Sequence, residues 1–191
     1  MDLITGIFSA FGLSASAGLN AYIPLLVLAL LTRYTDLIKL SSPWDGIANG
    51  WIIALLLVLS LIEFFADKIP AVNHLNDAIQ TFVRPTAGAI VFAARAQVIT
   101  EINPILSLGA GLLVAGGVHA VKSLVVRPVV TATTAGVGDV PVSIAEDIIS
   151  TGLSILSIIL PVFVFIFILV VTAWIVHRLW RRENQRRLLR P

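Results

Sequence analysis

Residues 63 to 88 read Glu63-Phe-Phe-Ala-Asp-Lys-Ile-Pro-Ala-Val-Asn-His-Leu-Asn-Asp-Ala-Ile-Gln-Thr-Phe-Val-Arg-Pro-Thr-Ala-Gly88 and lie between strongly apolar segments. This stretch carries three carboxylates, a lysine, an arginine and a histidine. An ionisable side chain at the centre of a bilayer costs about 2.5–3.5 kcal/mol on insertion scales, so such side chains pair with one another or face water. We therefore expect the stretch to fold back into a bundle of membrane helices and to supply a buried polar site.

The composition of the chain is typical of a membrane protein. Of its 191 residues 58% are hydrophobic and 13% are charged, and the mean hydropathy is +0.97. Soluble domains carry about 25% charged residues, and several apolar runs here approach the ~20 residues that a helix needs to cross a bilayer. We expect an all-α, polytopic bundle of transmembrane helices. Cysteine is absent, which excludes disulfides and thiolate metal sites, and the sequence leaves the cofactor and any metal unknown.

Positive charge is concentrated at the C-terminal end. Outside this end the chain has seven Lys or Arg and ten Asp or Glu, which argues against nucleic-acid binding. A basic cluster just after an apolar helix lies on the cytoplasmic side by the positive-inside rule and is suited to contact with anionic lipids. We expect a transmembrane domain over residues 1–176 and a basic cytoplasmic tail over 177–191, in a bacterial inner membrane. The arginines of the tail are Arg178, Arg181, Arg182, Arg186, Arg187 and Arg190.

Four apolar segments are firm candidate spans. The first is long enough to remain in the membrane rather than to act as a cleaved signal peptide. Pro24 and Pro161 should kink the first and the last of them. A cytoplasmic C-terminus places the N-terminus inside with four spans and outside with five. The segments cover about residues 7–32, 46–66, 102–121 and 144–180.

Local signals predict where the helices of the second half end and begin. Arg127-Pro128 should end the third span, because proline is poorly tolerated inside a helix. The segment from Thr131 to Pro141 is rich in Thr and Gly, which predicts a loop. Ser143-Ile-Ala-Glu146 matches a capping box, so the last helix should begin near Ile144.

Residues 70–98 form a fifth, polar segment. Pro70 is a natural first helical residue, and Pro85 with Gly88 should break the helix that follows. Whether the segment re-enters on one side or crosses the membrane is left open, because irregular backbone at membrane depth is allowed where it is buried in protein. Four polar residues recur at helical spacing and should share one face: Asn73, Asp77, Gln80 and Arg84.

An internal similarity suggests two repeated halves, residues 1–99 and 100–176. Gly12-Leu13, Gly18, Ala21, Leu25 and Thr32 recur 99 residues later as Gly111-Leu112, Gly117, Ala120, Leu124 and Thr131. In this register Asn20 falls opposite His119. Repeated halves whose broken helices meet at mid-membrane are a feature of secondary transporters. The alternative is chance, because Gly, Ala and Leu match easily between membrane helices.

Five motifs resemble a known family: Gly12-Leu-Ser-Ala-Ser-Ala-Gly-Leu-Asn-Ala-Tyr-Ile-Pro24, Asp67-Lys-Ile-Pro-Ala-Val-Asn-His-Leu-Asn-Asp77, Arg84-Pro-Thr-Ala-Gly88, His119-Ala-Val-Lys122 with Arg127-Pro128, and Ser143-Ile-Ala-Glu-Asp147. Together they resemble an uncharacterised integral-membrane family catalogued as domain of unknown function 4126. The resemblance covers roughly residues 6 to 165 and implies a compact bacterial membrane domain. It implies no activity.

The polar residues favour a pathway for an ion or small solute. Glu63 and Asp67 lie at i and i+4 on one helix face, where two like charges favour proton or cation exchange, and His119 could relay a proton near neutral pH. The hypothesis requires that these groups converge in the interior of the bundle. The candidate pathway residues are Asn20, Glu63, Asp67, Lys68, Asn73, His74, Asp77, Arg84, His119, Lys122, Arg127, Glu146 and Asp147.

Two other classes of function compete with transport. In the first, Asp67 or Asp77 pairs with Lys122, Arg84 or Arg127 in a buried ion-pair network that only holds the helices of a structural or assembly protein in register. In the second, the polar residues serve a membrane-embedded, lipid-acting enzyme, although the chain has no phosphate-binding loop, nucleophile elbow or zinc pattern. A chain with so few spans encloses little space, so we expect a homo-oligomer under every reading.

Overall fold

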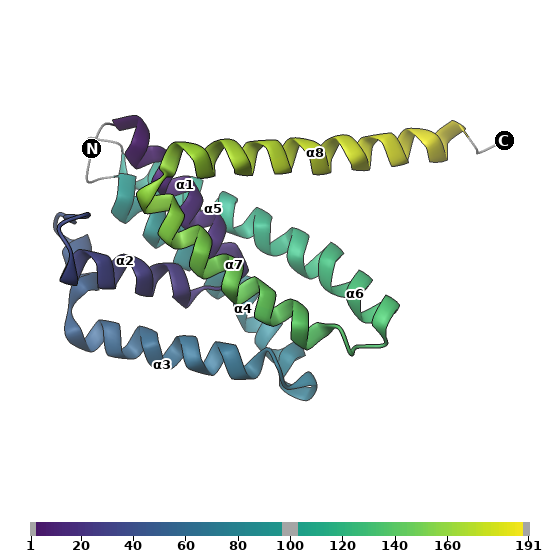
Figure 1. The fold of residues 1–191 in the computed structure, drawn as a ribbon, viewed down its shortest axis with the longest axis horizontal. Coiled ribbons are helices and arrows are strands. Elements are labelled where there is room, and N and C mark those ends of the chain that lie inside the picture. Colours follow the sequence, from purple (N-terminus) through teal and green to yellow (C-terminus); the bar gives the residue numbers. More distant parts are fainter. Residues whose placement is uncertain (1–2, 97–102, 189–191) are drawn as a thin grey trace.

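The computed structural model describes residues 3–96 and 103–188, and within them the side chains except those of residues 3, 70–74, 179 and 182–188. All regular elements of the described chain are helices, with no strand, as expected for an all-α bundle (Figure 1). A 3₁₀ turn, η1 (Trp44–Ala48), precedes α3, and a π-helical segment, η2 (Lys122–Val126), joins α5 to α6. The helices are α1 (Leu3–Leu19), α2 (Tyr22–Tyr34), α3 (Gly50–Ala66), α4 (Pro70–Ala96), α5 (Pro104–Val121), α6 (Arg127–Thr134), α7 (Asp139–Ile159) and α8 (Pro161–Leu188).

Helix α1 lies at the centre of the bundle and packs against α4, α5, α7 and the start of α8. Helices α2 and α3 pair beside this centre, and α2 also contacts α7. The far end of α8 extends away from the other helices (Figure 1). The polar faces of α4 and α7 therefore each pack against α1 inside the bundle. In contrast, α3 and α8 expose many large apolar side chains, as helices in contact with lipid do.

Three helical stretches are long and apolar enough to cross a membrane, as expected of an integral membrane protein. They cover Pro104–Thr134, Asp139–Ile159 and Pro161–Arg178. Three shorter helices are also apolar, namely Ile4–Leu19, Tyr22–Tyr34 and Gly50–Ala66. The exact number of spans and the internal repeat stay predictions.

Close packing at glycines holds α4 against α5 and α1. A Cβ added at Gly88 would lie 2.2 Å from the Cβ of Ala115, and one added at Gly111 would lie 2.4 Å from the carbonyl oxygen of Gly88. Ser14 of α1 donates a hydrogen bond of 2.8 Å to the carbonyl oxygen of Gly111. Small residues let helix backbones approach closely in lipid, where packing and interhelical hydrogen bonds replace the hydrophobic effect.

Replacing Gly88 with alanine should therefore destabilise the folded protein by about 1–3 kcal/mol, because the added methyl group has no room. Gly109→Ala is the matched control, since it adds the same methyl group to α5 where nothing lies within 4 Å. That control should be neutral or stabilising by up to about 1 kcal/mol through helix propensity. Thermal unfolding in detergent measures both, and equal stability of the two variants would contradict the packing argument.

Helix α4 corrects the prediction that Pro85 and Gly88 break this segment. The helix is continuous from Pro70 to Ala96, with Pro85 inside it. A proline inside a helix costs about 3 kcal/mol or more, but α4 packs on α1 and α5 through Gly88, three residues after the proline. Packing of this face outweighs the local break signal, and a re-entrant hairpin within residues 70–96 is excluded.

Three boundaries in the second half also differ from the prediction. Arg127-Pro128 does not end the helix, because the π-helical turn η2 leads into α6, where Pro128 lies in the first turn and needs no N–H partner. The predicted loop shrinks to residues 135–138. Helix α7 begins at Asp139 rather than near Ile144, so Ser143 is a buried residue within it and caps no helix.

Two predicted spans are each divided into two helices. The first is interrupted at Asn20 and Ala21, between α1 and α2. The last, predicted over 144–180 with a kink, is broken at Leu160, whose φ of −130° and ψ of 57° are not helical. Helix α8 leaves this break in a direction different from that of α7 (Figure 1).

Candidate functional site

The interruption between α1 and α2 places both helix ends in a polar environment. The last carbonyls of a helix carry partial negative charge and the first N–H groups carry partial positive charge. The Lys122 ammonium donates a 2.8 Å hydrogen bond to the carbonyl oxygen of Leu19, at the end of α1. The N–H of Ala21, just before α2, donates to Oε2 of Glu63 at 3.2 Å. The end of α1 and the start of α2 are thus each bound by a side chain whose charge is opposite to the partial charge of that helix end.

Asn20 stabilises the same interruption. Its Oδ1 accepts hydrogen bonds from the backbone N–H groups of Tyr22 and Ile23, both at 3.1 Å, which satisfies two donors at the start of α2. Its Nδ2 donates to Oδ1 of Asp147 at 3.0 Å. Lys68 binds the other oxygen of Asp147 at 3.1 Å. Asn20 therefore connects the broken helix to an ion pair between α7 and the end of α3.

The deepest ion pair joins Arg84 of α4 to Glu63 of α3. The Nη2 of Arg84 lies 2.9 Å from Oε1 of Glu63 and its Nε lies 3.2 Å from the same oxygen. Both side chains are 0% exposed. Arg84 also lies 3.6 Å from Asp67. One guanidinium thus compensates the two carboxylates that α3 and its C-terminal cap place one turn apart.

His119 of α5 lies beside this pair and is neutral on chemical grounds. Its Nδ1 lies 3.2 Å from Nη1 of Arg84, and a guanidinium can only donate, so Nδ1 must accept. The proton of the ring is then on Nε2, which lies 3.3 Å from the hydroxyl oxygen of Thr81. Thr81 in turn donates to the backbone carbonyl of Asp77 at 2.8 Å. All three hydrogen bonds are satisfied with an uncharged histidine.

Arg127, the first residue of α6, binds three carboxylates. Its guanidinium lies 3.1 Å from Asp67, 3.0 Å from Asp77 and 3.5 Å from Glu146. Lys122 pairs with Glu146 at 2.8 Å. The π-helical turn between Lys122 and Arg127 sets the positions of both cations, so this local irregularity shapes the centre of the cluster.

The structure brings together eleven of the thirteen predicted pathway residues, as the sequence hypothesis required. The side chains of Asn73 and His74 lie outside the described residues. We call the eleven the ionic cluster, and their functional roles stay predictions. Its members are Asn20, Glu63, Asp67, Lys68, Asp77, Arg84, His119, Lys122, Arg127, Glu146 and Asp147.

Sequence reasoning missed several uncharged partners of the cluster. Asn76 donates to Asp67 at 2.6 Å, and Ser143 reaches the other oxygen of Asp67 at 3.4 Å. Thr81 follows Asp77 by one helical turn, so its place beside the cluster could have been predicted from the sequence. Asn76 follows Asn73 by three residues and precedes Gln80 by four, so the same spacing could have placed it at the edge of the polar face of α4.

Charge and exposure vary across the ionic cluster. Its described side chains include five carboxylates and four cations, which leaves a net charge of −1 with His119 neutral. Exposure rises from 0% at the pair of Glu63 and Arg84 to 26% at Asp77. The cluster is therefore closed at its deep end and more accessible near Asp77.

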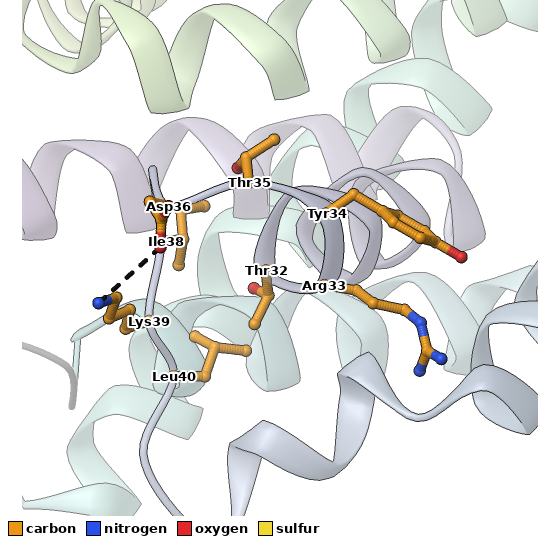
Figure 2. A pocket seen from close by; sticks show the side chains of 8 residues that line it. All are labelled: Thr32, Arg33, Tyr34, Thr35, Asp36, Ile38, Lys39 and Leu40. Carbon is orange, nitrogen blue, oxygen red and sulfur yellow. Dashed lines mark ion pairs between the residues drawn. The ribbon is translucent and has the colours of Figure 1, made fainter.

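A separate surface pocket lies at the end of α2 and shares no residue with the ionic cluster. It has a volume of about 440 Å³ and is lined by residues 32–36 and 38–40. Figure 2 shows Lys39 paired with Asp36, an exposed contact of 3.9 Å. Arg33, on its rim, donates to the carbonyl oxygen of Ala48. Among the described residues no group of three or more His, Asp or Glu is arranged to hold a metal ion.

The sequence of this chain matches one family model over residues 7–182, that of the Domain of unknown function (DUF4126). The chain belongs to this family. The DUF4126 match extends beyond residue 165, where the sequence resemblance was expected to end, and so includes most of α8. The comparison with curated proteins finds no match, and the comparison with solved structures finds none.

Proposed function

We propose that this protein is a membrane transporter or channel that moves an ion or small solute through the ionic cluster. The observation that carries the proposal is the interrupted helix α1–α2, whose two ends are bound by Lys122 and Glu63 inside that cluster. Discontinuous helices whose ends contact ions and substrates are a feature of secondary transporters. Pro24 favours an interruption at Asn20 because it removes the N–H that would bond the carbonyl group there. Inside a membrane the freed backbone groups must be satisfied by other groups, and here charged side chains of the cluster do so.

The connectivity of the cluster supports the same proposal. Arg127 and Arg84 share Asp67, and Lys122 and Arg127 share Glu146, so displacement of one partner by a solute changes the pairing of the others. These residues belong to α4, α5–η2–α6, α7 and the end of α3. A bound ion can thus change the relative positions of several helices at once.

Topology and assembly complete the proposal. Helix α4 has 27 residues, about 40 Å at ~1.5 Å per residue, which is enough to cross the bilayer with its polar face inward. The predicted repeat is supported by two helix irregularities, one at Asn20 and one at η2, which begins three residues after His119. We further propose a homo-oligomer, a cytoplasmic C-terminus that contacts anionic lipids through its arginines, and location in the bacterial inner membrane.

The same geometry supports one competing function, a structural or assembly role. Every charged member of the ionic cluster has a partner of opposite charge. Buried ion pairs of this kind can hold helices in register without any transport. Flux measurements separate the two functions.

Neutralising a carboxylate of the cluster should reduce flux at least tenfold. Glu63→Gln, Asp67→Asn and Asp77→Asn each remove one charge from the pathway, and Asp36→Asn is the control because its side chain is fully exposed. Proteoliposomes under proton, Na⁺, K⁺ or anion gradients, read with indicator dyes, measure the flux. Wild-type flux in all three folded cluster variants would remove these residues from the mechanism. No flux above that of empty liposomes for the wild type would favour the assembly role.

A further inference from the structure

A buried acceptor without a hydrogen-bond partner lies within the polar face of α4. Gln80 is 2% exposed, and its Oε1 has no hydrogen-bond partner in the described part of the chain. Gln80 follows Asp77 by three residues and precedes Arg84 by four, so it lies between two cluster residues on one face of the helix. Buried polar atoms are almost always hydrogen-bonded, and an orphaned one calls for a specific explanation.

The surroundings of Gln80 are also those of the helix interruption. The phenol of Tyr22, the first residue of α2, is hydrogen-bonded to the side chain of Gln80 and lies within electrostatic reach of Glu63 and Arg84, so only Oε1 of the Gln80 amide lacks a partner among the described residues. The start of α2 and the polar face of α4 therefore meet at this point. The oxygen atoms near this point are those of the Tyr22 phenol, the Gln80 amide and the Glu63 carboxylate. Oxygen atoms are the ligands preferred by alkali and alkaline-earth cations.

The net charge of the ionic cluster indicates the sign and the magnitude of the charge that a bound ion should carry. With five carboxylates, four cations and a neutral His119, the described cluster has one negative charge in excess, although each of its carboxylates contacts a cation. An uncompensated charge in a bundle interior is costly. One monovalent cation makes the cluster neutral, whereas a divalent cation or an anion does not.

We propose that the ionic cluster binds one monovalent alkali cation, Na⁺ or K⁺, with Oε1 of Gln80 as one of its ligands. The inference rests on the proposed transport function, in which this cation is the coupling or transported ion. The orphaned acceptor and the excess negative charge are independent observations, and one bound cation would satisfy both. Bound there, the cation compensates the net negative charge of the ionic cluster.

Thermal unfolding of the purified chain in nanodiscs tests the proposal without any transport measurement. NaCl and KCl are compared with choline chloride at equal ionic strength and constant pH. A ligand that binds only the folded state at ten times its Kd raises its stability enough to shift Tm by about 3–6 °C for a chain of this size. We expect this shift with at least one of the two alkali cations.

Gln80→Met should abolish the response, because it keeps the shape of the side chain and removes the oxygen. In choline chloride the same variant should stay within about 1 kcal/mol of the wild type, since it removes an unsatisfied buried acceptor but also the hydrogen bond between Gln80 and Tyr22. Ser107→Ala is the matched control. Ser107 of α5 is also buried, its hydroxyl also lacks a partner among the described residues, and its loss should leave the cation response unchanged.

Three results would overturn the proposal: no alkali-cation shift in the wild type, a full shift in Gln80→Met, or a shift that follows pH alone, which would assign the charge to a proton. Flux in proteoliposomes without any cation shift would overturn the cation site and leave the transport function standing. A cation-dependent shift of Tm without any flux would overturn the transport function and leave the cation site standing.

Discussion

Replacing Arg84 with methionine should destabilise the folded protein by about 3–5 kcal/mol, as breaking a buried ion pair does. The variant leaves Glu63 charged at a position that is 0% exposed. It also removes the donor to Nδ1 of His119 and one partner of Asp67. Thermal unfolding in detergent or nanodiscs measures the loss. Arg181→Met, on the exposed part of α8, is the control and should stay within about 0.5 kcal/mol of the wild type.

A double-mutant cycle isolates the pair itself. Glu63→Gln alone leaves Arg84 with Asp67, at 3.6 Å, as its anionic partner among the described side chains. The double variant Glu63→Gln with Arg84→Met removes both charges, so its loss of stability should be smaller than the sum of the single losses by about 2 kcal/mol. Additive losses would show that the two side chains do not interact in the folded protein, contrary to the 2.9 Å contact.

The location of the site could be predicted from the sequence because a charged side chain is unstable in lipid and must pair with another charge or face water. The recurrence of Asp77, Gln80 and Arg84 at helical spacing predicted one polar face on α4, and these three residues do lie inward. The same reasoning predicted that His119 and Glu146, from other helices, converge with this face, which the structure confirms. Short side chains such as these cannot reach the membrane surface.

The pairing within the site could not be predicted to the same extent. The sequence left open which of Lys122, Arg84 and Arg127 pairs with which acid, because the answer depends on the rotation and the offset of four helices. Arg127 binds three acids only because the helix continues through the π turn η2, where the sequence predicted an end at Arg127-Pro128. Here tertiary packing overrides a local signal, as it does at Pro85.

The charge count of the cluster makes a second strong prediction, centred on Arg127. Arg127→Met changes the net charge of the described cluster from −1 to −2 and leaves Asp67 and Asp77 without their nearest cation. We expect a loss of at least about 3–5 kcal/mol, and flux below detection. Arg127→Lys should recover only part of the stability, because a single ammonium cannot reproduce the fork that binds three carboxylates.

Asp77→Asn added to Arg127→Met should restore stability in part, because the net charge of the cluster returns to −1. Asp77→Asn alone makes the cluster neutral, and its folded state should no longer gain stability from an alkali cation. Tm of the four proteins, measured in NaCl, KCl and choline chloride, gives both results in one experiment. If Asp77→Asn keeps the full cation response, the excess charge does not recruit the cation. If the double variant is less stable than Arg127→Met, charge balance does not govern this cluster, and the specific contacts of Arg127 do.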